Sequence, residues 1–146
     1  MEAKELMIGD LMKTNSTSWG EDLKDKYCEV TFLGNYIVSR LIDEPWKEAY
    51  GESNSFEPIT PTPEILEKNG FRKYNLHEIK GQHQWTWWDD KSTSVSLWYR
   101  ELNDDPKDGM MVRVDSPLVH GCIKVDYLHQ LQHALRLCGI EKEIIL

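Results

Sequence analysis

The stretch QHQWTWWDDKSTSVSLWY, residues 82–99, decides the fold of the second half of this chain. Its two arms, residues 82–88 and 93–99, are rich in aromatic and β-branched residues, and the polar run at residues 89–92 is typical of a tight turn. We therefore expect two antiparallel strands here. Residues 109–114 follow another turn-forming segment and are expected to add a third strand to the same sheet.

Alternation along these strands predicts that tryptophans lie on both faces of the sheet. Trp85 and Trp87 share one face and Trp88 lies on the other, while on the partner strand Trp98 lies on the face opposite Val95 and Leu97. One face would pack beneath a helix, and the second would expose indole rings, a surface suited to stacking on sugars, bases or a partner's side chains. The alternative is that core packing accounts for most of the rings. The candidate binding surface comprises Trp85, Trp87, Trp88, Trp98, Arg100 and Arg113.

Two helices are expected to flank this sheet. Thr62 and Pro63 are suited to the N-cap and first position of a short helix, and Gly70 is suited to its end. Residues 127–138 form an amphipathic helix that ends before Gly139, after a short strand at residues 122–125. Its apolar face is expected to lie on the sheet.

The first part of the chain is expected to be β-rich. Residues 27–32 and 36–41 read as a hairpin, and the composition of residues 43–61 predicts a linker or long loop. The segment is compatible with an SH3-like barrel. The expected fold class is thus α+β, an antiparallel sheet of three to four strands with two helices after this segment. A single compact domain over residues 1–146 is favoured, with sub-lobes at 1–61 and 62–146 as the alternative.

The segment His129-Gln130-Leu131-Gln132-His133 resembles the H-E-x-x-H helix of zinc proteases. Gln130 replaces the glutamate, and an amide cannot act as the general base that this chemistry requires. His129, His133 and Asp126 are weak candidates for metal ligands. Helical projection places both histidines opposite the apolar stripe, where a solvated polar face is the favoured interpretation. No catalytic residue is assigned, and the protein is predicted not to be an enzyme.

Composition limits the partners. A net charge of −8 makes nucleic-acid binding improbable, because that binding depends on clustered Lys and Arg. An odd number of cysteines without a C-x-x-C pair favours reduced thiols and a cytoplasmic location. We expect no membrane association, because no long apolar run is present. No nucleotide-binding motif occurs, so no cofactor is expected. The sequence does not determine the oligomeric state.

Three stretches carry a resemblance to a known family: KELMIGDL at residues 4–11, EPITPTPEILEKNGF at 57–71 and IKVDYLHQLQHALRLCGIEKE at 123–143. They resemble small uncharacterised proteins of Bacteroides-type gut bacteria that are often encoded in prophages and other mobile elements. The resemblance covers about a third of the chain. It implies an intracellular, phage- or mobile-element-associated α+β protein, and it implies no activity.

Two main functions are consistent with these observations. The first is a non-enzymatic interaction module that docks on a protein partner through the tryptophan-bearing sheet face or the acidic N-terminal part. The second is a small-ligand binder that holds a nucleotide or sugar between Trp88 or Trp98 and Arg100 or Arg113. A metal-dependent hydrolase built on the two helical histidines is a remote third interpretation.

Overall fold

The structure is a computed structural model. It describes residues 5–15, 21–74, 82–89, 93–100, 110–117 and 119–146. The chain divides into two compact units, Met1–Ile59 and Thr60–Leu146, called here the N-terminal and C-terminal units. Their boundary lies two residues before the sub-lobe boundary expected from the sequence. Among the described helices, none has the length and apolar character needed to cross a membrane.

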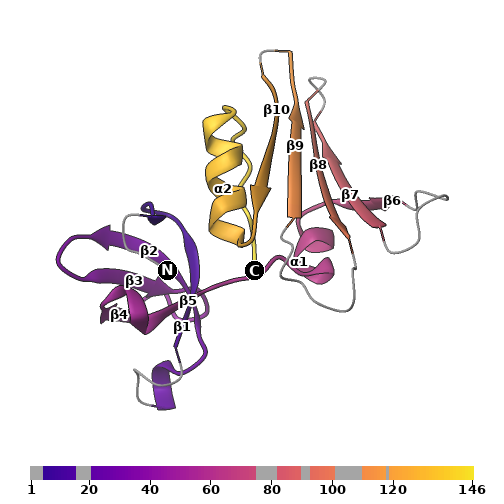
Figure 1. Cartoon of the computed structure of the whole chain (residues 1–146). Coiled ribbons are helices and arrows are strands. Elements are labelled where there is room, and N and C mark those ends of the chain that lie inside the picture. The colour runs from indigo at the N-terminus through magenta and orange to yellow at the C-terminus, as the bar shows by residue number, and fades with distance from the viewer. Residues whose placement is uncertain (1–4, 16–20, 75–81, 90–92, 101–109, 118) are drawn as a thin grey trace. The chain divides into compact units, whose positions relative to one another are not determined.

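The N-terminal unit is a five-stranded antiparallel sheet in the order β4-β3-β2-β1-β5 (Figure 1). A 3-10 turn, η3, lies directly before the last strand of this unit. The core gathers apolar side chains from the strands, among them Met12, Cys28 and Ile37. The elements are β1 (Leu11–Thr14), η2 (Glu21–Leu23), β2 (Tyr27–Leu33), β3 (Ile37–Leu41), β4 (Glu48–Gly51), η3 (Ser53–Ser55) and β5 (Phe56–Pro58).

The expected hairpin is confirmed, because β2 pairs with β3 in antiparallel register. The prediction of a linker or long loop over residues 43–61 is wrong, since this segment contains β4 and β5. Both strands lie at the edges of the sheet, where a short strand needs only one partner. Pro58 is tolerated there because an edge strand can leave one side of its backbone unpaired.

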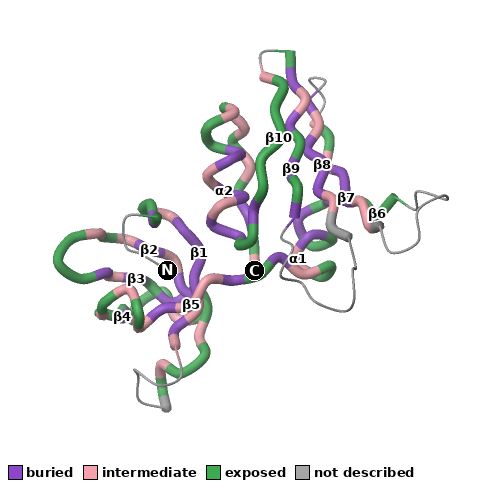
Figure 2. Tube along the Cα trace, viewed as in Figure 1, coloured by how far each residue is buried: buried purple, intermediate pink, exposed green. Residues whose placement is uncertain are grey.

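The C-terminal unit is a meander of five antiparallel strands in the order β10-β9-β8-β7-β6. The α+β fold class is therefore confirmed, with one strand more than expected. The elements are α1 (Pro63–Lys68), β6 (Arg72–Tyr74), β7 (Gln82–Trp88), β8 (Ser94–Arg100), β9 (Met110–Asp115), β10 (His120–Val125) and α2 (Leu128–Leu137). Buried and exposed residues alternate along β9, so the two sheet faces have different environments (Figure 2).

Local signals define both ends of α1 as expected. The Thr62 hydroxyl accepts a hydrogen bond from the Ile65 backbone N–H at 3.4 Å, and Gly70 ends the helix with a φ of 76°. Asn69 then ties the helix to the C-terminal residues. Its Nδ2 donates to the Ile145 carbonyl at 2.7 Å, and its Oδ1 accepts from the Ile145 N–H at 2.8 Å. The last residues of the chain are thus held against the end of α1.

Candidate binding surface

Strand register assigns the tryptophans of β7 and β8 to the two sheet faces. Trp85 pairs with Leu97 and Trp87 with Val95, which places these four side chains on one face. Trp88 belongs to the opposite face. The neighbouring strand β9 extends the first face with residues that are themselves buried, namely Val112 and Val114.

The first face is the covered one. Trp85 is 1% exposed and forms part of the core. Trp87 is half-buried, and the Lys142 ammonium lies 4.9 Å from its ring centroid and 5.8 Å from that of Phe71. Partial burial lowers the pKa of Lys142. Neither Trp85 nor Trp87 therefore presents a free ring to a partner.

The second face is called here the open face, and it carries Tyr74, Trp88, Trp98, Met111 and Arg113. The rings of Tyr74 and Trp88 meet edge to face with centroids 5.3 Å apart, yet each residue keeps 46% of its surface exposed. Trp98 is half-buried opposite the exposed Met111. An exposed apolar and aromatic row therefore crosses the sheet.

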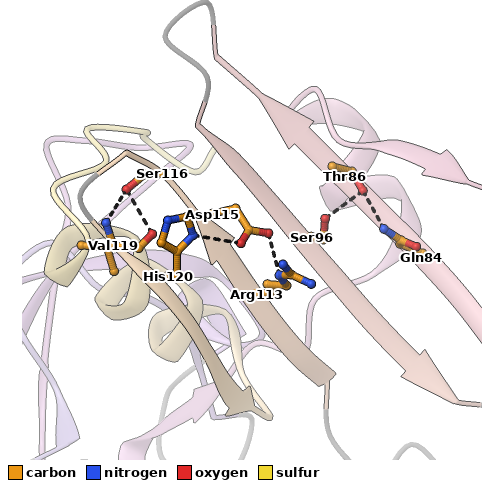
Figure 3. A network of polar contacts seen from close by, with 8 residues as sticks. All are labelled: Gln84, Thr86, Ser96, Arg113, Asp115, Ser116, Val119 and His120. Carbon is orange, nitrogen blue, oxygen red and sulfur yellow. Dashed lines mark hydrogen bonds and ion pairs between the residues drawn. The ribbon is translucent and has the colours of Figure 1, made fainter.

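A line of polar groups crosses the same face (Figure 3). Gln84 Nε2 donates to Thr86 Oγ1 at 3.2 Å, and the hydroxyls of Thr86 and Ser96 lie 3.1 Å apart. Both hydroxyl residues are buried although they belong to the open face. The register explains this for Thr86, because along β7 it lies between Gln84, the cross-strand partner of Tyr74, and Trp88, and the rings of Tyr74 and Trp88 meet over this position.

Arg113, Asp115 and His120 form the charged end of that line (Figure 3). Arg113 Nε lies 2.6 Å from Asp115 Oδ2, and His120 Nδ1 lies 3.3 Å from Asp115 Oδ1. The hydrogen bond from Arg113, with a smaller contribution from His120, lowers the pKa of Asp115. Ser94 also pairs with Asp115 in register. The carboxylate thus lies between the serine and the imidazole, which is not the order of a Ser-His-Asp triad.

The sequence-predicted surface is therefore divided by the fold. Trp88, Trp98 and Arg113 lie together on the open face, whereas Trp85 and Trp87 lie on the covered face. Arg100 ends β8, and its side chain lies outside the described residues.

The prediction that His129 faces water is wrong, because the residue is 1% exposed. The Tyr127 ring stacks on His129 with centroids 5.8 Å apart, and the His133 ring approaches at 5.8 Å. The buried arc of α2 is wider than the apolar stripe, because it also includes His129 and Gln132. Apolar periodicity could not reveal this, since it counts only hydrophobic residues.

The three candidate metal ligands do not form a site in the described part of the chain. Asp126 is exposed, with Oδ1 3.7 Å from Lys124 Nζ. No group of three or more His, Cys, Asp or Glu side chains able to hold a metal occurs among the described residues.

Gln130 has a structural role that the motif comparison did not suggest. Its Oε1 accepts hydrogen bonds from the backbone N–H groups of Asp126 at 2.7 Å and Tyr127 at 3.3 Å. These donors lie at the start of α2, where helical backbone N–H groups lack partners within the helix. The glutamine therefore caps the helix.

Sequence reasoning missed Tyr74 and Met111 as members of the open face. Tyr74 belongs to β6, which has only three residues and no recognisable alternation. Met111 could have been found, because strand alternation from Arg113 places it on the same face.

No protein-family model matches this chain, and none of the curated proteins searched matches it.

Proposed function

We propose that this protein is a cytoplasmic, non-enzymatic interaction module that binds a protein partner through the open face of its C-terminal unit. One observation carries the proposal: the open face exposes Tyr74 and Met111 in one cross-strand row, together with Trp88, whose ring meets that of Tyr74, on a sheet whose other face is already buried. Aromatic residues and methionine are enriched in protein interfaces, and clustered exposed apolar side chains mark contact surfaces.

The surroundings of this row support recognition rather than chemistry. The hydroxyls of Thr86 and Ser96 are bonded to each other, and the Asp115 carboxylate is held by Arg113 and His120. These groups order the surface and provide a polar rim of the kind that borders interface cores. The three cysteines are free thiols, in keeping with a reducing compartment. The resemblance noted above favours a phage or mobile-element origin.

A small-ligand binder is the second candidate, favoured by the shared face of Trp98 and Arg113. Its weakness is that Asp115 neutralises Arg113 at 2.6 Å, which reduces attraction for a phosphate. Titration with nucleotides and saccharides, followed by tryptophan fluorescence, separates the two candidates. Saturable quenching by one compound, lost in Trp98→Ala, would replace the protein-binding proposal.

The direct test uses affinity capture with three forms of the tagged protein. The first is wild type, the second carries Trp88→Ala with Met111→Ser, and the third is the control Leu137→Ser at a 78% exposed site on α2. We expect a protein that co-elutes with wild type and the control but not with the open-face variant. Identical captured proteins for all three forms would refute the use of this face.

A further inference from the structure

A second exposed aromatic surface lies on the N-terminal unit. Phe32, Tyr36 and Tyr50 are 49%, 50% and 54% exposed, respectively. The ring centroid of Tyr36 lies 6.2 Å from that of Phe32 and 6.4 Å from that of Tyr50. We call these three residues the aromatic row. The exposed face of a small sheet is ordinarily polar, so three adjoining exposed rings call for a function.

The backbone holds this row in place. Val38 of β3 pairs with Phe32 on one side and Tyr50 on the other, so the three residues lie side by side on the outer face. Phe32 also packs against Gly34, where an added Cβ would lie only 2.6 Å from the ring. The rings are thus positioned by strand pairing and by a close backbone approach before any partner arrives.

Carboxylates border the row. The next cross-strand row consists of Glu29, Arg40 and Glu48, and Arg40 is paired with Glu29 at 2.9 Å. Glu48 accepts a hydrogen bond from the Tyr50 hydroxyl, which places its negative charge at the edge of that ring. Exposed Glu52 follows directly after β4. One arginine therefore faces three glutamates around the aromatic row.

The charge of the whole N-terminal unit has the same sign. Residues 1–59 contain 6 Lys and Arg against 12 Asp and Glu, a net charge of −6, whereas residues 60–146 contain 11 against 13, a net charge of −2. Aromatic faces attract cations through their quadrupole, and nearby carboxylates add charge attraction. The two features together select a positively charged ligand.

We infer that the aromatic row binds a Lys- or Arg-bearing peptide segment of a protein partner. The cationic side chains lie over the tyrosine rings and pair with Glu48 and Glu52. This site does not depend on the open face, because its residues belong to the other unit.

The test measures fluorescence anisotropy of a fluorescein-labelled peptide of alternating Arg and Gly, with the matching Lys and Glu peptides. We expect wild type to bind the Arg or Lys peptide and not the Glu peptide. Tyr36→Ala with Tyr50→Ala should weaken binding about two- to fivefold for each lost cation–ring contact. Tyr36→Phe, which keeps the ring, should retain binding, as should Leu137→Ser at an exposed position of α2 in the C-terminal unit.

Equal binding by wild type and the double alanine variant would overturn the inference, because the attraction would then be nonspecific. Failure of wild type to bind either cationic peptide would overturn it as well. A dimer in sedimentation that Tyr50→Ala abolishes would assign the row to a second copy of the chain instead. Circular dichroism checks that each variant is folded.

Discussion

Replacement of Gln130 tests whether this residue caps α2 or belongs to a degenerate metal site. In Gln130→Ala, the backbone N–H groups of Asp126 and Tyr127 lose their acceptor, at 2.7 and 3.3 Å. Loss of a helix N-terminal cap costs about 1 kcal/mol, which corresponds to a fall in Tm of roughly 4–8 °C for a unit of this size.

The matched variant Gln130→Glu restores the H-E-x-x-H pattern while keeping an acceptor at the same place. A carboxylate at a helix N-terminus is also favoured by the helix dipole, by roughly 0.3–1 kcal/mol. We therefore expect this variant to melt at or slightly above the wild-type Tm at pH 7. Zinc should not raise its Tm, and it should not gain peptidase activity.

Thermal unfolding by circular dichroism, with zinc or with a chelator, measures both variants. An unchanged Tm in Gln130→Ala would refute the capping role. A zinc-dependent rise in the Tm of Gln130→Glu, abolished by His133→Ala, would show that the helical histidines hold a metal and would refute the conclusion that they form no metal site.

Three further predictions concern stability. Trp85→Ala should lower the free energy of unfolding in urea by about 3–5 kcal/mol, because it leaves a cavity at a fully buried site. Trp88→Ala on the open face should lower it by only about 1 kcal/mol. Equal losses would contradict the assignment of the two residues to different faces. Burial raises the pKa of the Cys28 thiol from 9.0 to about 11, so folding favours the neutral form. The stabilisation is complete below pH 9 and is lost as pH rises from 9 to 11, by about 3 kcal/mol, and parallel pH profiles for wild type and Cys28→Ala would argue against this cause. Asn69→Ala should destabilise the C-terminal unit by about 1–3 kcal/mol, because the backbone N–H and carbonyl of Ile145 lose their hydrogen-bond partner. The rate of hydrogen exchange at the Ile145 amide should rise, and an unchanged rate would show that other contacts hold the terminus.

The sequence by itself determined the elements whose signals are local. Thr62, Pro63 and Gly70 define α1, because capping and positive φ depend on only a few neighbouring residues. The alternation of Trp85, Thr86 and Trp87 likewise places the two tryptophans on one face of a strand and Thr86 on the other.

Only the tertiary structure decided which surfaces are covered. β5 depends on pairing with the distant strand β1, and β4 and β6 are too short for composition alone to mark them as strands before they pair with β3 and β7. The burial of His129 likewise depends on packing around α2, whereas the cap that Gln130 provides is a local contact, to backbone groups three and four residues before it. Trp85 and Trp88 have the same chemistry and nearly the same position in the sequence. One is core and the other is surface because helices and the C-terminal residues cover a single face of the sheet, and that is a long-range property of packing.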